Sequence, residues 1–354
     1  MKKEPLYQQI QNIIKEQIQS GKLRLGDRVP SEKELMEEFH VSQITTKNAL
    51  TGLAEEGIVV RIKGKGTFVA ESDLLKSQQH YRQESNGLIG LILPTMKTKV
   101  EQELVNYIEK YTSQKGYQLL IKITRESQFE EADAIEMFQG IGVKGMIIFP
   151  TEKETYNEAI LRLTLDKFPL VLVDRYLENI RTYSVSSDNR KGTFTAISHL
   201  LDKGHTHIGL ISPIITNTVT EERTKGFEDA FIKNDIMVNK KLWLFLNFNN
   251  ICFDKTPDII KEFLMENPNI TSLFVMNAEL AIYTYEAIQA MNKESNRHIE
   301  LISFDSLGII GSSYIEQDID ECSKQTINLL VEQIDGGYNP KRIFVPVRLK
   351  VENK

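Results

Sequence analysis

Residues 30–57, PSEKELMEEFHVSQITTKNALTGLAEEG, contain two predicted helices separated by a tight turn. Ser31 can cap the first helix, and Glu34, three residues later, completes the pattern of a capping box. Ser42 can cap the second helix, which Gly57 ends. A short helix, a tight turn and a longer helix predict a helix-turn-helix.

The flanking residues extend this motif on both sides. An amphipathic helix precedes it, with apolar residues at helical spacing: Leu6, Ile10, Ile13, Ile14 and Ile18. After it, residues 58–62 and 67–69 are strand-like and enclose the turn Lys63-Gly64-Lys65-Gly66, which predicts a β-hairpin with two lysines at its tip. The whole predicts a winged helix-turn-helix, whose third helix can enter the major groove while the wing lies along the backbone or the minor groove.

Beyond the polar stretch 71–86, which we interpret as a linker, strands alternate with helices. The strand-like runs are 88–93, 118–123, 145–149, 170–173, 207–211, 242–245, 272–275 and 301–304. The predicted helices are 99–115, 128–139, 154–165, 190–203, 221–234, 256–266, 278–291 and 319–335. Repeated strand–helix units predict doubly wound parallel sheets, and residues 87–354 are too many for one core, so we expect two lobes. Ligands of such sheets bind at the carboxyl ends of the strands, here in a cleft between the lobes.

The composition supports a DNA-facing module on a larger acidic body. The 354 residues carry a net charge of −6, divided as +2 in residues 1–70 and −8 in the remainder. No apolar run reaches the length of about 18 residues that a transmembrane helix needs, and the N-terminus lacks the apolar core of a secretory signal. The two cysteines, Cys252 and Cys322, lack metal-site spacing and are expected to be buried thiols in a reducing compartment. We therefore expect a cytoplasmic protein without a membrane partner.

The head resembles the DNA-binding domain of GntR-type bacterial regulators. The resemblance rests on GDRVPSEKELM at 26–36 and GIVVRIKGKGTFV at 57–69. It implies that DNA is met by residues at the starts of the second and third helices and on the wing: Ser31, Lys33, Ser42, Gln43, Thr46, Lys47, Arg61, Lys63, Gly64, Lys65 and Gly66. The family commonly has Arg where Gln43 and Lys47 stand here. Arg pairs bidentately with guanine, whereas Gln suits adenine and Lys is a point charge.

The body resembles the effector-binding domain of LacI/GalR-type repressors, which is similar to periplasmic sugar-binding proteins. The resemblance rests on stretches that include VKGMIIFP at 143–150, PLVLVDR at 169–175, VSSDNRKG at 185–192, ERTKGF at 222–227, LFVMN at 273–277 and LISFD at 301–305. It implies five ligand-facing residues: Arg175, Asp188, Arg223, Asn277 and Asp305. Carboxylate, amide and guanidinium groups converging on a cleft suit the hydroxyls of a sugar. Structural roles stay open for some of them, since Arg175 could pair with Asp174 and Asp305 could cap a turn.

The predicted fold class is therefore α/β: an N-terminal winged helix-turn-helix and a two-lobed periplasmic-binding-protein-like domain with parallel sheets. The predicted head covers 1–70, the linker 71–86 and the effector-binding domain 87–354. Within that domain, one lobe is expected at about 87–184 and 308–337, and the other at about 185–307 and 338–354. A GntR-type head on a LacI-type body resembles the bacterial arabinose-repressor subgroup.

This architecture predicts a homodimeric transcription regulator. We expect a repressor of carbohydrate-utilisation genes that leaves its double-stranded operator when a small sugar binds. No catalytic residue, metal site or cofactor is expected. Two alternatives stay open: the effector is a sugar phosphate or a purine, with Lys97 and Lys99 available to an anion, or the chain is a solute-binding α/β protein without a regulatory role.

Overall fold

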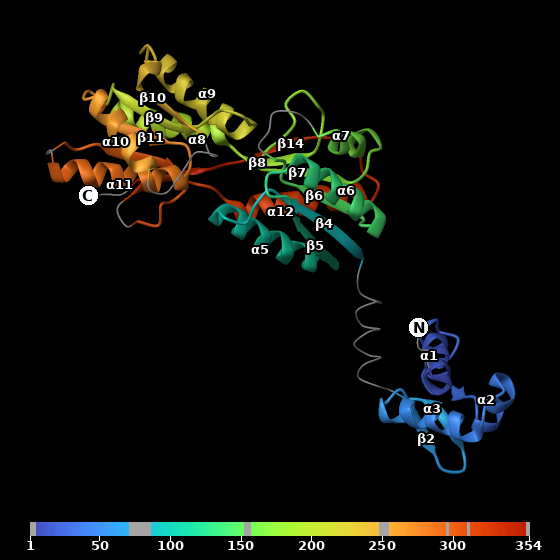
Figure 1. Cartoon of the computed structure of the whole chain (residues 1–354). Coiled ribbons are helices and arrows are strands. Elements are labelled where there is room, and N and C mark those ends of the chain that lie inside the picture. Colours follow the sequence, from blue (N-terminus) through green and yellow to red (C-terminus); the bar gives the residue numbers. More distant parts are fainter. Residues whose placement is uncertain are drawn as a thin grey trace. The chain divides into compact units, whose positions relative to one another are not determined.

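The computed structural model describes residues 5–70, 86–151, 157–247, 255–294, 297–309 and 312–351. The chain divides into two compact units, Met1–Ser85 and Asn86–Lys354 (Figure 1). Cys252, nearly all of the predicted linker 71–86 and the start of the predicted helix 154–165 fall outside the described residues.

The first unit is a winged helix-turn-helix. Its described elements are α1 (Leu6–Gln19), β1 (Arg28–Val29), α2 (Glu32–Phe39), α3 (Gln43–Glu55), β2 (Val59–Ile62) and β3 (Gly66–Val69). Both predicted caps are present: Ser31 and Glu34 form the capping box of α2, and the Ser42 hydroxyl accepts from the Thr45 N–H at the start of α3. His40 makes the turn between the two helices in a left-handed conformation, with φ of 51°. The sheet order β1-β3-β2 adds a strand that the sequence did not predict.

The second unit contains two six-stranded sheets. The first sheet has the order β14-β8-β7-β6-β4-β5, and all its strands are parallel. The elements of this N-lobe are β4 (Gly87–Leu93), α5 (Lys99–Gln114), β5 (Tyr117–Ile123), α6 (Gln128–Ile141), β6 (Gly145–Ile148), α7 (Glu158–Leu165), β7 (Leu170–Val173), β8 (Ser184–Ser187), α12 (Ile319–Ile334) and β14 (Arg342–Val345). At Gly90 a Cβ would lie 2.3 Å from the Phe138 ring, so the absent side chain lets α6 pack directly on β4.

The second sheet forms the C-lobe, with the order β10-β9-β11-β12-β13-β15. Its elements are α8 (Asn189–Asp202), β9 (Ile208–Pro213), α9 (Thr218–Lys233), a 3₁₀ turn η1 (Lys240–Leu242), β10 (Trp243–Leu246), α10 (Thr256–Glu266), β11 (Ser272–Val275), α11 (Ala278–Glu294), β12 (Glu300–Phe304), β13 (Ser313–Glu316) and β15 (Arg348–Lys350). Among the described strands of this sheet, only β15 runs antiparallel to its neighbour. Read from its other edge, the first sheet has the order β5-β4-β6-β7-β8-β14, which matches the second sheet strand for strand, so β7 in one lobe corresponds to β12 in the other.

The chain passes between the lobes three times: after β8 at Ser187, after β13 at Glu316 and after β14 at Val345. The predicted lobe boundaries at 184/185, 307/308 and 337/338 are therefore too early. β13 pairs with β12 and belongs to the C-lobe, while β14 pairs with β8 and belongs to the N-lobe. These strands are only four residues long, and β8 consists of Ser-Val-Ser-Ser, so their hydrophobic patterns are too weak to place them.

The α/β class, the winged head and the predicted strand-like runs of the body are confirmed. Within the described residues, no helix is long and apolar enough to cross a membrane.

Candidate functional site

The head carries an open groove of about 720 Å³ between the start of α2, the start of α3 and the wing. Its lining comprises Arg28, Ser31, Glu32, Lys33, Met36, Gln43, Leu50, Arg61, Ile62, Lys63, Gly64, Lys65, Gly66 and Thr67. Five of these side chains are cationic and one, Glu32, is anionic. A groove with this charge suits a polyanion.

Eight of the eleven predicted DNA-facing residues line this groove: Ser31, Lys33, Gln43, Arg61, Lys63, Gly64, Lys65 and Gly66. Ser42 and Lys47 lie outside the lining but are exposed at the start of α3. The prediction for Thr46 is wrong, because Thr46 is fully buried and its hydroxyl donates to the Gln43 carbonyl at 3.0 Å. Thr46 shares its helix face with Ala49, Leu50 and Leu53, which are all buried in the head core.

The two lysines of the wing stand at the rim of this groove. Arg61 pairs with Glu32 at 3.0 Å, which fixes the wing against α2. Among the described residues, no carboxylate lies within ion-pair distance of Lys63 or Lys65. Gly64 has φ of 77°, a conformation that favours glycine at the tip. Arg28, which the sequence analysis missed, enters the groove from β1 and lies 3.2 Å from the Cβ position of Gly66.

In the body, two aspartates occupy equivalent positions at the ends of corresponding strands. Asp174 follows β7 and Asp305 follows β12, with φ of 67° and 69°. The backbone N–H of each aspartate donates to a carbonyl of the next strand in its sheet. Asp174 donates to Val185 of β8 at 2.9 Å, and Asp305 donates to Ile315 of β13 at 3.0 Å. The role of Asp305 was predicted, whereas Asp174 was expected only as a possible partner of Arg175. The parallel between LVLVD at 170–174 and LISFD at 301–305 was the available signal.

Arg223 is a buried cation on α9, with 5% of its surface exposed. Its Nε donates to Asn189 Oδ1 at 2.8 Å, one terminal nitrogen donates to the Met276 carbonyl, and the guanidinium lies 3.5 Å from the centre of the Phe304 ring. Burial lowers the pKa of Arg223, while the charges of Asp305 and Asp174 oppose that effect. Burial likewise raises the pKa of both aspartates. The charge of Arg223 opposes the rise for Asp305, whereas Arg175 and then Arg223 oppose it for Asp174. The three groups therefore form one electrostatic cluster, to which the N-lobe contributes Asp174 and the C-lobe contributes the other two.

The other predicted effector residues have structural partners as well. Arg175 donates to the Pro150 carbonyl at 2.8 Å, approaches Glu126 at 3.7 Å and lies over the Phe149 ring at 4.9 Å. It is therefore tethered within the N-lobe by groups other than Asp174.

Asp188 and Asn277 are helix caps at strand ends. Asp188 accepts from the Lys191 N–H at 3.1 Å at the start of α8, and Asn277 accepts from the Leu280 N–H at 2.9 Å at the start of α11. Both are partly exposed, so each retains capacity for a ligand.

Asp305 is also held in place by a neighbouring side chain. The Gln317 amide donates to its carboxylate at 2.8 Å.

Four of the five predicted effector residues lie at strand ends or helix starts. The exception is Arg223, which lies within the second turn of α9.

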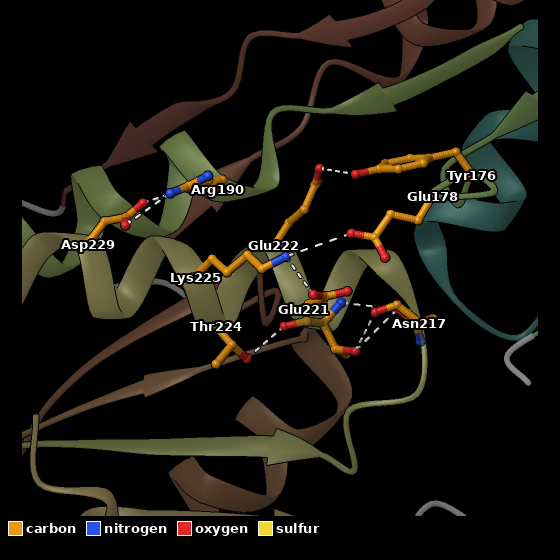
Figure 2. Close-up of polar contacts among 10 residues, drawn as sticks. Tyr176, Glu178, Arg190, Asn217, Glu221, Glu222, Thr224, Lys225 and Asp229 are labelled. Carbon is orange, nitrogen blue, oxygen red and sulfur yellow. Dashed lines mark hydrogen bonds and ion pairs between the residues drawn. The ribbon is translucent and has the colours of Figure 1, made fainter. Parts of the chain in front are cut away.

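Glu222 and Tyr176 are further polar residues that the sequence analysis missed. The Tyr176 hydroxyl, from the segment after β7, donates to Glu222 on α9 at 2.6 Å and so joins the two lobes (Figure 2). Burial raises the pKa of Glu222, and hydrogen bonds from Tyr176 and Asn189 oppose the rise. The sequence did offer one indication of both residues, because each is adjacent to a predicted ligand residue: Tyr176 follows Arg175, and Glu222 precedes Arg223.

The described residues were compared with the requirements of a metal site and of a reactive thiol. No group of three or more His, Cys, Asp or Glu side chains there could hold a metal ion. Cys322 is a free, buried thiol, as predicted, and burial raises its pKa to about 12.

Two family models match consecutive parts of the chain. Residues 6–69 match bacterial regulatory proteins of the gntR family, and residues 86–329 match periplasmic binding proteins and the sugar binding domain of the LacI family. The second match spans more than half of the chain.

The similar proteins are regulators. An arabinose metabolism transcriptional repressor of Halalkalibacterium halodurans is 28% identical over 302 residues, which are 83% of this chain and 80% of that protein. A protein of the same description from Geobacillus stearothermophilus is 26% identical over 345 residues, 94% of this chain and 92% of that protein. The solved structure of a transcriptional regulator CelR–cellobiose complex has a TM-score of 0.66 and 18% identity, over 88% of this chain and 90% of that one, and so shares the fold. This chain belongs to the family of periplasmic binding proteins and LacI-type sugar-binding domains, and it carries the DNA-binding head of a gntR-family regulator.

Proposed function

We propose that this protein is a repressor that binds operator DNA through its head and releases it when a small neutral sugar occupies the cleft of its body. The observation that carries the proposal is that buried Arg223 interacts electrostatically with both Asp174 and Asp305, which follow corresponding strands of different lobes. A ligand that hydrogen-bonds to both aspartates would join the lobes. The two repressor relatives support the regulatory role, because their similarity spans both the head and the body.

The charge of the cleft favours a neutral ligand over a sugar phosphate. Arg223 already faces two carboxylates and donates to Asn189 and Met276, and Arg175 already faces Glu126. A phosphate would add negative charge beside Asp174 and Asp305, and each unpaired buried charge is costly. Lys99 pairs with Glu103 at 3.5 Å, and the charge of Lys97 opposes the rise in the pKa of Glu279, so each of these lysines already has an acidic neighbour.

A purine is also disfavoured by the aromatic groups present. A flat base needs a free ring face for stacking, but a guanidinium lies over Phe304 at 3.5 Å and over Phe149 at 4.9 Å. A sugar needs no such face, because its hydroxyls pair with carboxylate and amide oxygens.

We further propose that DNA meets the eight predicted residues that line the groove, together with Ser42, Lys47 and Arg28. The functional form would be a homodimer in the cytoplasm, since two-fold operators match two-fold proteins. The protein would bind its sugar without converting it. The domain limits 1–70, 71–86 and 87–354 remain part of this proposal.

The test begins with selection of duplexes from a random-sequence library by the full-length protein. Thermal shift then screens L-arabinose, D-xylose, D-ribose and cellobiose against their phosphates and against purines. We expect a two-fold symmetric duplex to be enriched, and a neutral sugar both to raise the Tm and to release that duplex. Enrichment of no sequence would overturn the regulatory role and favour a solute-binding protein. Release by a sugar phosphate alone would overturn the assignment of the ligand class.

A further inference from the structure

The segment that follows β7 reaches across to α9 of the other lobe. Tyr176 provides two of the contacts: its hydroxyl donates to Glu222 Oε1 at 2.6 Å, and its backbone N–H donates to the Thr218 hydroxyl at 3.3 Å. The third is an ion pair between Glu178 and Lys225 at 4.0 Å (Figure 2). All three connect the N-lobe to one face of α9.

These contacts are unequal in strength. Glu178 and Lys225 are 52% and 43% exposed, and Lys225 has a closer partner in Glu221 at 2.5 Å. Exposed ion pairs of this kind contribute little. The Tyr176–Glu222 bond is short, partly buried and made to a carboxylate, which places it among the stronger hydrogen bonds.

Side chains of the N-lobe also hold the tyrosine in position. The Arg342 guanidinium from β14 lies 4.4 Å from the centre of the Tyr176 ring, and Phe344 meets the ring edge-on at 6.1 Å. Arg342 also donates to the carbonyls of Leu177 and Glu178, both at 2.6 Å. The hydroxyl is therefore aimed at the C-lobe by a rigid support.

On the C-lobe side, the same contact is linked to the cleft. Asn189 hydrogen-bonds to Glu222 and accepts from Arg223 Nε at 2.8 Å. Asn189 is also the first residue of α8, immediately after the chain crosses between the lobes. Glu222 and the ligand-facing Arg223 thus share one buried amide at the crossing.

We propose that the Tyr176–Glu222 hydrogen bond is an interlobe latch that stabilises the closed cleft, so that it strengthens effector binding without touching the effector. Tyr176 is then a positioning residue for the sugar site, and this role rests on the proposed function only where sugar affinity is concerned. Loss of a hydrogen bond to a charged group should lower the ratio of closed to open molecules about tenfold, which corresponds to ~1.4 kcal/mol.

The test measures lobe separation directly in the full-length protein. Nitroxide labels at Glu136→Cys on α6 and Glu262→Cys on α10 report the distance between the lobes by pulsed electron resonance, in a Cys252→Ser background. Tyr176→Phe removes only the hydroxyl and keeps the ring against Arg342. Asp229→Asn is the matched control, because it breaks an ion pair of 2.6 Å with Arg190 that joins α8 to α9 within the C-lobe (Figure 2).

We expect Tyr176→Phe to move part of the population to longer distances, Glu222→Gln to do so less, and Asp229→Asn to leave the distribution unchanged. The affinity for whichever sugar of the panel binds should fall in proportion to the closed fraction. An unchanged distribution in Tyr176→Phe would overturn the latch, as would an equal shift in Asp229→Asn. If the distances shift but no sugar binds, the latch stands and the proposed effector class fails.

Discussion

Asp174 and Asp305 both adopt a left-handed backbone conformation, which costs an ordinary L-residue about 1–2 kcal/mol. Aspartate and asparagine tolerate this conformation better than other side chains with a Cβ. Each aspartate stands at the end of its strand, and its charge acts on Arg223. The conformation and the chemistry therefore select the same residue type at both positions.

Variants of Asp305 can separate the effect of its charge on sugar binding from the effect of its backbone strain on stability. Asp305→Asn keeps the left-handed tolerance and an acceptor for Gln317, but removes the charge. We expect the Tm to change little while sugar affinity falls about tenfold to a hundredfold, as for loss of a charged hydrogen bond. Asp305→Ala should show the same binding defect and, because of added strain, a Tm lower by roughly 2–8 °C. Thermal unfolding and calorimetric titration measure both effects.

Asp174→Asn is the internal comparison, since it changes the corresponding residue of the other lobe. It should reproduce the result for Asp305→Asn; normal sugar affinity in both variants would remove the aspartates from the site. Arg223→Ala is a poorer test, because it removes a buried cation from beside two half-buried carboxylates and should destabilise the fold as well as weaken sugar binding.

Glu300, on β12, should contribute stability that depends on pH. Its carboxylate accepts from Lys203 at 2.6 and 2.7 Å and lies 3.2 Å from His205 Nε2. Burial raises the pKa of Glu300, but Lys203 and His205 outweigh it, so the folded pKa lies below the usual value. A depressed carboxylate pKa adds stability above the unfolded pKa of about 4.3, and that stability is lost as the pH falls through the folded pKa.

Glu300→Gln should therefore lower the Tm at pH 7, by an amount that corresponds to about 0.5–1 kcal/mol after allowance for partial exposure. The difference from the wild type should narrow below roughly pH 4.3. Glu262→Gln, on the exposed side of α10, is the control. A difference that stays constant from pH 7 to about pH 3 would contradict this account.

At the scale of elements, the head was predicted well where the sequence carries caps and periodicity. Ser31 and Ser42 began their helices as expected, because a capping side chain is a local signal. Thr46 was wrongly predicted to face DNA, although its spacing from Ala49, Leu50 and Leu53 places it on the buried face of α3. Arg28 was missed because β1 has two residues and exists only through its pairing with β3, which is a tertiary contact.

The groove predicts two kinds of DNA-binding defect. Lys65→Ala should weaken binding to all duplexes similarly and reduce the slope of log affinity against log salt by about 0.9, because it removes one phosphate contact. Gln43→Ala should lose preference at one base pair, worth about 1–3 kcal/mol. Salt titrations on the selected duplex and its single-base variants measure both.

Lys22→Ala, an exposed lysine of the head outside the groove lining, is the matched control and should leave the slope unchanged. Full base preference in Gln43→Ala would show that another face of α3 reads the sequence. Thr46→Val should keep the base preference of the wild type, since Thr46 is buried.

The body shows the same division between local and tertiary signals. Long apolar runs such as Gly87–Leu93 are visible in the sequence because burial on both sheet faces requires them. β8, β13, β14 and β15 are short or polar, and neighbouring strands determine their positions. Asp174 and Tyr176 were missed for a related reason: their roles depend on the opposite lobe, which no local pattern describes.

At the scale of the whole molecule, effector and operator binding must affect each other equally. If the sugar weakens affinity for the selected duplex by some factor, the duplex must weaken sugar affinity by the same factor, typically 5- to 150-fold. Titrating sugar with and without saturating duplex measures one factor, and titrating duplex with and without sugar measures the other. Unequal factors would mean that a further equilibrium, such as subunit dissociation, takes part.

The three crossings between the lobes also determine the order in which the body can be completed during synthesis. Residues 188–316 contain every element of the C-lobe except β15, whereas the N-lobe lacks α12 and β14 until residue 345 has been made. On the ribosome, the middle of the chain can therefore fold into a nearly finished lobe while β6, β7 and β8 still await the helix that covers them. The lobe whose first strand emerges earliest is the last to be closed.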